Sequence, residues 1–293
     1  MSIKDLKSKI SDSNLRVLIG LTPVVEKELM EDIHLRASMN HDITEYDKGT
    51  TKDYYYKSEL DLSEKFAYCL HTAYLDAGFD PHESGELQDA LNEEHHGKIT
   101  ALEGHSNLRM RQMVIEGSVR ASSMDFGILD TYPCYAKISV LGIPAKTELT
   151  IFQELVLEAY ALQHENNERV AFFTYFTALE ALVSAKLAVI AKGLFEELHY
   201  ALEHLPLEHK VRVIFKHYAG AKFAKLPIYS ELQGLLSDVK KKRNDLAHGK
   251  TVVKISDDDV VDILCVILVL VGYTEVKLDT FVKIRKHYYK KDK

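Results

Sequence analysis

Apolar residues recur at helical spacing through the C-terminal half of the chain. Positions three and four residues apart line one face of a helix, and this pattern predicts helices over 148–165, 167–192, 194–205, 207–218, 228–248 and from 257 onward. Gly249 is a suitable C′ residue for the fifth helix, and Ser256 a suitable N-cap for the last. Asp257, Asp258 and Asp259 complement the dipole of that helix in its first turn. Residues 146–293 are therefore expected to form an all-α bundle.

The N-terminal half has a mixed pattern. Short apolar or alternating runs predict strands over 15–21, 110–121 and 134–143, and the runs 62–77 and 86–94 have helical character. Pro133, and the Gly142-Ile143-Pro144 segment, punctuate the chain just before the long helical patterns begin. We therefore expect an α+β domain of unknown role over residues 1–145, followed by the helical bundle.

Composition and charge exclude several classes of protein. The 293 residues are 46% hydrophobic, which argues against disorder, and the formal net charge is −7. Residues 1–145 carry 15 basic and 24 acidic side chains (net −9), whereas residues 146–293 carry 22 and 20 (net +2). This asymmetry excludes a broad basic coat for nucleic acid, but it leaves room for a small site in the C-terminal half.

The chain is expected to be cytoplasmic, with no membrane association. Its longest apolar stretch, 260–272, is interrupted by Asp262 and is shorter than the roughly 20 residues that cross a bilayer. The first residues lack the apolar core of a secretory signal. The three cysteines are scattered and form no disulfide framework.

Two clusters in the N-terminal half have ordinary explanations. The run from Glu93 to His96 contains metal-ligand residue types, but it has no matching second cluster, so a solvated loop is the favoured interpretation. The run from Lys52 to Tyr56 contains tyrosines that can stack on bases, although a strand or loop with surface tyrosines is more common. No metal or other cofactor is expected.

Two opposite charges fall on apolar helix faces. Arg243 lies within the stripe that carries Leu236, Val239 and Leu246, at 100° per residue. A guanidinium facing a core is costly unless it meets an acid or hydrogen-bond acceptors. Glu180 lies within the apolar stripe of the 167–192 helix, so we expect it to contact Arg243 directly or through water. The alternative is that Glu180 extends to solvent.

A polar group follows Arg243 on the same helix. Asn244 and His248 are four residues apart and therefore share a face. Imidazole exchanges protons near neutral pH, and a guanidinium can clamp phosphate oxygens. Four surrounding lysines are candidates for binding an RNA backbone: Lys240, Lys241, Lys242 and Lys250. Lys254 adds positive charge nearby.

The segment Arg243-Asn244-Asp245-Leu246-Ala247-His248 resembles the R-x4-H motif of HEPN domains. With Lys242 before it and Gly249 after it, the segment resembles the form seen in the HEPN group named after the abortive-infection protein ApeA. The phenylalanine-rich helix that contains Ala178-Leu179-Glu180 and the apolar last helix also fit. The resemblance covers residues 146–280 and implies a HEPN-like helical bundle.

The family resemblance implies metal-independent endoribonuclease activity in a defence or stress effector that acts as a toxin. The RNA 2′-hydroxyl attacks the adjacent phosphorus, with Arg243, Asn244 and His248 as catalytic residues and Glu180 in support. One histidine is too few for both general acid and general base, so the resemblance implies a composite site in a homodimer.

One position departs from the family pattern. HEPN toxins that are controlled by an antitoxin nucleotidyltransferase commonly have tyrosine two residues after the motif histidine, where this chain has Lys250. Control by tyrosine adenylylation is therefore not supported. The rival interpretation is a noncatalytic HEPN module that binds RNA or another protein. Residues 1–145 are candidates for binding a regulatory partner or trigger.

Overall fold

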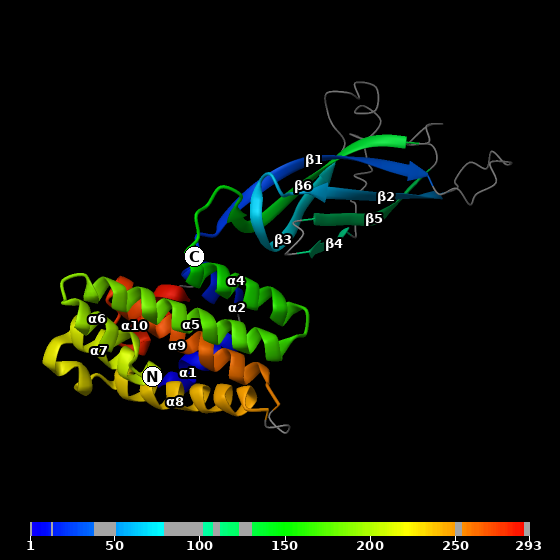
Figure 1. Ribbon diagram of the computed structural model, residues 1–293. Coiled ribbons are helices and arrows are strands. Elements are labelled where there is room, and N and C mark those ends of the chain that lie inside the picture. Colours follow the sequence, from blue (N-terminus) through cyan, green and yellow to red (C-terminus); the bar gives the residue numbers. More distant parts are fainter. Residues whose placement is uncertain are drawn as a thin grey trace. The chain divides into compact units, whose positions relative to one another are not determined.

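The chain divides into two compact units (Figure 1). The computed structural model describes residues 2–12, 14–37, 51–78, 102–107, 112–122, 131–249 and 254–289. The helical unit consists of Met1–Pro23 together with Glu148–Lys293, and the sheet unit consists of Val24–Thr147. The sequence prediction therefore placed the second boundary within a few residues, but it wrongly assigned residues 1–23 to the N-terminal domain.

The corrected boundary sharpens the charge asymmetry. The sheet unit carries 12 basic and 22 acidic side chains, a net charge of −10. The helical unit carries 25 basic and 22 acidic side chains, a net charge of +3. The unit that contains the candidate motif is thus the more basic of the two.

The described part of the sheet unit is an antiparallel sheet. Its strands are β1 (Val25–Ala37), β2 (Thr51–Asp61), β3 (Phe66–Gly78), β4 (Leu102–Asn107), β5 (Gln112–Ser122) and β6 (Thr131–Pro144). They are ordered β3-β6-β1-β2-β5-β4. The β1–β6 ladder runs from Val25 opposite Gly142 to Arg36 opposite Thr131. Gly142 is required there because a Cβ at this position would collide with the main-chain oxygen of Tyr68.

The sheet confirms some predictions for this region and contradicts others. β5 and β6 confirm the strands predicted over 110–121 and 134–143. The helix predicted over 62–77 is wrong, because β3 occupies 66–78. The run from Lys52 to Tyr56 lies in strand β2. Both the predicted helix over 86–94 and the cluster Glu93–His96 lie outside the described residues.

The helical unit contains every helix predicted in the C-terminal half. Its elements are α1 (Ile3–Asp12), α2 (Asn14–Leu21), α4 (Ile151–His164), α5 (Glu168–Ala191), α6 (Glu196–Glu203), α7 (Leu207–Ala219), the 3₁₀ helix η1 (Gly220–Lys225), α8 (Pro227–Ala247), α9 (Asp257–Val276) and α10 (Phe281–Tyr288). The strand predicted over 15–21 is wrong, since these residues belong to α2. Val17, Leu18 and Leu21 are its buried residues, and their spacing is helical.

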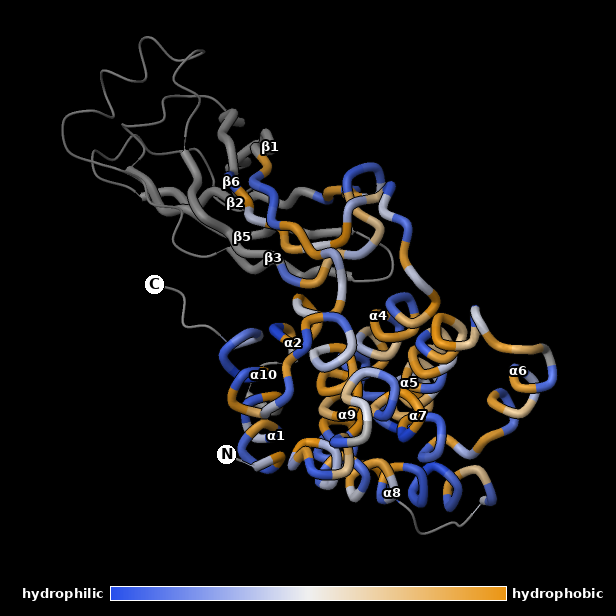
Figure 2. The backbone as a smooth tube through the Cα atoms, turned by 90° about the vertical axis from the view of Figure 1, so that its left-hand side faces the viewer, coloured by the Kyte–Doolittle hydropathy of each residue, from blue (hydrophilic) through white to orange (hydrophobic). Residues whose placement is uncertain are grey.

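Helix α9 is the centre of the helical unit. It packs against α1, α2, α5, α8 and α10, and Figure 2 shows it as apolar along most of its length, whereas α8 alternates between apolar and polar segments. All residues from Ile263 to Thr274 are buried. Removing this apolar surface from water is the main contribution that holds the bundle together.

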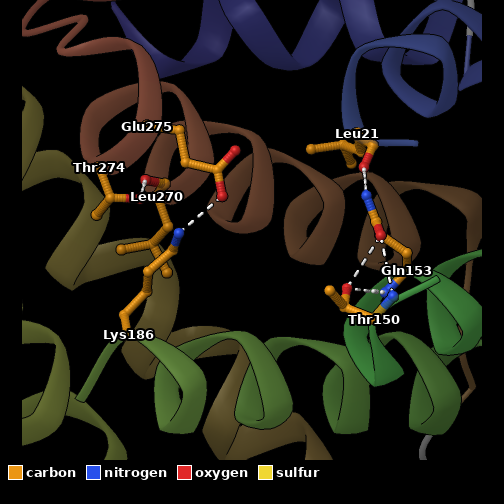
Figure 3. Close-up of polar contacts among 7 residues, drawn as sticks. All are labelled: Leu21, Thr150, Gln153, Lys186, Leu270, Thr274 and Glu275. Atoms are coloured by element: carbon orange, nitrogen blue, oxygen red, sulfur yellow. Dashed lines mark hydrogen bonds and ion pairs between the residues drawn. The ribbon is translucent and has the colours of Figure 1, made fainter. Parts of the chain in front are cut away.

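Caps and long-range polar contacts fix the other helices around α9. Thr150 caps α4 in a capping box with Gln153, and Gln153 Nε2 also donates a hydrogen bond to the Leu21 carbonyl (3.2 Å), which joins α4 to α2 (Figure 3). Lys186 of α5 forms an ion pair with Glu275 of α9 at 2.7 Å (Figure 3). Residues 1–23 are therefore an integral part of the bundle.

Among the described residues, α5 is the one helix whose length and composition would allow it to cross a membrane. This is weak evidence, because a core helix of a soluble protein passes the same test. Helix α5 packs against α4, α7 and α9, and its aromatic residues Phe172, Tyr175 and Phe176 are buried. Its apolar character is that of a core helix.

Candidate functional site

Arg243 projects from the penultimate turn of α8 towards α5. Leu236, Val239 and Leu246 of the same helix are buried. Arg243 itself is half-buried, and its guanidinium carbon lies 5.4 Å from the centroid of the Phe176 ring. A guanidinium over an aromatic face is stabilised by the ring quadrupole. The prediction that Arg243 faces the neighbouring helix is therefore confirmed, and its partner is an aromatic ring.

Asn244 connects Arg243 to His248. Arg243 Nη1 donates a hydrogen bond to Asn244 Oδ1 at 3.3 Å. The main-chain N–H of His248 donates to the main-chain carbonyl of Asn244 at 3.0 Å, which closes the last turn of α8. The motif residues thus lie together in the last turns of the helix, where Phe176 and Asn244 contact the guanidinium.

His248 is the C-cap of α8, and its side chain is exposed. Gly249 follows with φ +68°, a left-handed conformation that glycine adopts at little cost. This glycine ends the helix directly after the histidine. The imidazole therefore stands at the helix end, where a ligand or a second molecule can reach it.

The direct contact predicted between Glu180 and Arg243 is wrong, and the alternative, that Glu180 extends to solvent, is confirmed. Glu180 is exposed, and the described residues show no hydrogen bond or ion pair between it and Arg243. It lies on the solvent face of α5 with Thr177 and Ser184, which are three and four residues away. Most of the circumference of α5 is apolar, so apolar neighbours in the sequence do not locate its buried side. Phe176, one turn before Glu180, is the residue that meets Arg243.

Two of the four candidate RNA-binding lysines are neutralised inside the fold. Lys240 Nζ lies 2.7 Å from the Glu208 carboxylate of α7, and Lys242 forms an ion pair with Asp259 of α9. Lys241 is exposed, and Lys250 lies outside the described residues. Lys240 and Lys242 therefore help to hold α8 against α7 and α9.

The carboxylates in these pairs titrate below their usual range. Burial by itself raises the pKa of Asp259, but hydrogen bonds from Lys242 and Ser256 outweigh it, and the pKa is lowered. Burial likewise raises the pKa of Glu208, and the hydrogen bond from Lys240 outweighs it. Both acids are therefore ionised at neutral pH, and they cancel the charges of their lysines.

In the described residues, no group of three or more His, Cys, Asp or Glu side chains is arranged to hold a metal ion. The groups that the site offers are a guanidinium, a carboxamide and an exposed imidazole. Together they can bind a phosphate and move a proton.

Sequence reasoning missed Phe176, Glu208 and Asp259. Phe176 lies at helical spacing among the apolar residues of α5, and nothing in its own helix shows which neighbour it meets. The sequence places Asp259 in the first turn of α9, where it complements the helix dipole, and the short connection from α8 to α9 is a signal that it lies near Lys242. Glu208 is the second residue of α7, and its contact depends on how α7 packs against α8.

Comparisons with protein-family models, with curated proteins and with solved structures found no match to this chain. The function is therefore argued from the residues and their contacts.

Proposed function

We propose that this protein is a metal-independent endoribonuclease of the HEPN type. The observation that carries the proposal is the linked group at the end of α8. Arg243 is held by Phe176 and Asn244, and His248 is exposed one turn further on. The sequence of this group resembles the R-x4-H motif, and its position at the end of a bundle helix agrees with that resemblance.

In the proposed reaction the RNA supplies its own nucleophile. The 2′-oxygen attacks the adjacent phosphorus, so that a bond forms from phosphorus to O2′ and the bond from phosphorus to O5′ breaks. A base takes the 2′-hydroxyl proton, and an acid protonates the leaving O5′. The products carry a 2′,3′-cyclic phosphate and a 5′-hydroxyl.

Each residue of the motif has a distinct task in this reaction. Arg243 stabilises the additional negative charge on the phosphate oxygens. Its bond to Asn244 uses one of five guanidinium N–H groups, so the other four can donate to the phosphate. His248 transfers a proton. Asn244 keeps the guanidinium in place and is therefore a positioning residue.

The need for both an acid and a base suggests two copies of the chain. We propose a homodimer in which the exposed end of α8 meets the same end of a second copy, so that two His248 side chains share one cleft. This arrangement predicts that the specific activity falls on dilution below the dissociation constant of the dimer, and analytical ultracentrifugation measures that constant independently.

The acidic sheet unit is proposed to recognise a regulatory partner or trigger. Its net charge of −10 disfavours binding to RNA. We further propose that the protein acts in the cytoplasm, as a defence or stress effector.

The proposal is tested with the purified full chain and an unstructured RNA in EDTA. The wild type is expected to release cyclic-phosphate products, and His248→Ala and Arg243→Ala are expected to lose at least a hundredfold in rate. His287→Ala is the matched control, because His287 is also exposed but lies on α10. RNA with methylated 2′-hydroxyls must resist cleavage. Activity that survives His248→Ala would contradict the proposal, and binding of RNA without any cleavage would favour the noncatalytic module.

A further inference from the structure

The longest stretch of the chain without an acidic residue runs from 209 to 230. It contains five lysines and arginines together with two histidines, and it forms most of α7, all of η1 and the start of α8. The rest of the helical unit is nearly balanced in charge, so the excess positive charge of this unit is concentrated here.

The folded chain places these cations on one continuous surface. His209, Arg212 and Lys216 are exposed and lie on one face of α7, since they are three and four residues apart. Lys222 and Lys225 are exposed on η1, where residues three apart are eclipsed. The Arg212 guanidinium carbon lies 5.9 Å from the centroid of the Phe223 ring, which joins η1 to the exposed face of α7. We call these five residues the basic surface.

The cations of the basic surface differ from the lysines of the motif in their partners. Lys240 and Lys242 are neutralised by Glu208 and Asp259. By contrast, the hydrogen bonds and ion pairs of the described residues include none for Lys216, Lys222 or Lys225. Free cations on an exposed surface attract a polyanion, because its binding releases condensed counterions.

We propose that the basic surface binds the phosphate backbone of single-stranded RNA, as an anchoring site separate from the cleavage motif. The choice of RNA as the polyanion rests on the proposed function. Lys225 lies just before the first turn of α8, and His248 follows its last turn. The 21 residues of α8 span about 30 Å at ~1.5 Å per residue. An RNA held at Lys222 and Lys225 therefore reaches the motif only if it is several nucleotides long, whereas the start of α7, where Glu208 pairs with Lys240, lies nearer to the motif.

Exposed aromatic rings next to the basic surface favour a single strand over a duplex. The rings of Tyr200 and His204 are stacked with centroids 4.1 Å apart, and Tyr200 is 66% exposed. His204 precedes His209 by five residues, so the chain keeps this stack close to the start of the basic surface. Unpaired bases stack on such rings, whereas the bases of a duplex are already stacked on each other.

The test measures binding separately from cleavage. The probe is a labelled oligouridine with methylated 2′-hydroxyls, which lacks the nucleophile, and its fluorescence anisotropy is followed across a range of salt concentrations. The full chain with Lys216→Gln, Lys222→Gln and Lys225→Gln is compared with a matched triple variant, Lys4→Gln, Lys277→Gln and Lys286→Gln. The matched lysines are exposed elsewhere on the helical unit, and the change in net charge is the same.

The basic-surface variant is expected to lose about 10- to 100-fold in affinity at low salt. Its slope of log affinity against log salt is expected to fall by about 2, since each phosphate contact on a single strand contributes about 0.7. The matched variant keeps the wild-type slope. Equal slopes for the two variants overturn the proposal. The proposal also fails if polyglutamate displaces the probe as effectively as RNA of the same charge does.

A cleavage experiment separates this inference from the proposed function. The basic-surface variant is expected to cleave a dinucleotide at the wild-type kcat/KM, because a dinucleotide reaches only the motif, and to cleave long RNA with a raised KM. An equal loss on both substrates would contradict a separate anchoring site. If the wild type cleaves neither substrate, the proposed function fails, while the binding experiment still decides whether the surface holds RNA.

Discussion

The Arg243 guanidinium carbon lies 5.4 Å from the centroid of the Phe176 ring, so the charge near the end of α8 faces an aromatic side chain of α5. Phe176 is buried, with 3% of its surface exposed. A contact of this kind contributes about 0.5–2 kcal/mol. The ring also limits the directions in which the guanidinium can point. Phe176 is therefore a positioning residue for Arg243.

Replacement of Phe176 by leucine is expected to lower RNA cleavage about tenfold, because the guanidinium loses its platform. Stability is expected to fall by about 1–3 kcal/mol, as for other truncations in a core. Phe172→Leu is the matched control, since Phe172 is fully buried one turn earlier on α5. It is expected to cost similar stability and to leave kcat unchanged. Equal losses of kcat in the two variants would show that only general packing matters.

Glu180→Gln is expected to change neither cleavage nor stability. Its carboxylate is exposed on α5, and exposed substitutions away from specific contacts usually stay within about 0.5 kcal/mol. Arg243→Gln, measured beside it, is expected to abolish cleavage. Urea unfolding and initial rates on one RNA test both variants. A large loss of activity in Glu180→Gln would show that the Glu180 carboxylate supports catalysis, and would contradict this prediction.

The helices of the C-terminal half were predictable because their signals agree with one another. In α8 the apolar spacing predicts the helix and Gly249 marks its end. In α9 the apolar spacing predicts the helix and Ser256 marks its start. Short apolar runs carry less information. Residues 15–21 suit a strand or a buried helix equally well, and the neighbours of α2 decide between them. In β3 the apolar residues recur at spacings of three and four, as they do on one face of a helix, although the segment is a strand whose register with β6 is shifted at three places. These apolar residues are Phe66, Cys69, Leu70, Ala73 and Ala77.

For the site, the sequence located the residues but not all of their partners. The position of Arg243 within an apolar stripe correctly indicated that it faces a neighbouring helix. The choice of Glu180 as its partner rested on the general expectation that a buried cation needs an anion. A half-buried guanidinium meets part of that need with an aromatic ring and an amide oxygen. The register between α5 and α8 decides which residue of α5 meets Arg243, and packing along the whole length of the two helices sets that register.

Two glycines of the helical unit are expected to respond oppositely to replacement by alanine. A Cβ at Gly20 would collide with the Tyr288 ring of α10, whereas a Cβ at Gly234 on α8 would meet nothing within 4 Å. Gly20→Ala therefore displaces Tyr288 and loosens α10, with a loss of about 1–3 kcal/mol. Gly234→Ala is expected to stabilise the unit by about 0.5–1 kcal/mol, through its higher helix propensity. Thermal unfolding measures both effects, and hydrogen exchange in 281–288 shows whether α10 is released. Equal melting temperatures for the two variants would contradict this difference.

Two aspartates on α9 are expected to change stability with opposite dependence on pH. Burial raises the pKa of Asp259, but hydrogen bonds from Lys242 and Ser256 outweigh it, so the folded value lies below the ordinary 3.8. The stabilisation from Asp259 is therefore present above pH 3.8 and lost as the pH falls through the folded value. For Asp262, burial raises the pKa more than Lys7 lowers it. Its favourable contribution is present below pH 3.8 and lost as the pH rises through the folded value.

Asp259→Asn is accordingly expected to reduce the free energy of unfolding by about 1–2 kcal/mol at pH 7, through loss of the cap and of the pair with Lys242. The difference from the wild type should shrink as the pH is lowered through the folded pKa of Asp259. Asp262→Asn should behave in the opposite way and gain stability relative to the wild type as the pH rises from acidic values to 7. Urea unfolding followed by circular dichroism at several pH values measures both differences. The two aspartates lie only three residues apart on one helix, but hydrogen bonds outweigh burial for Asp259 and not for Asp262. Parallel pH profiles for the two variants would therefore contradict the opposite directions of their pKa shifts.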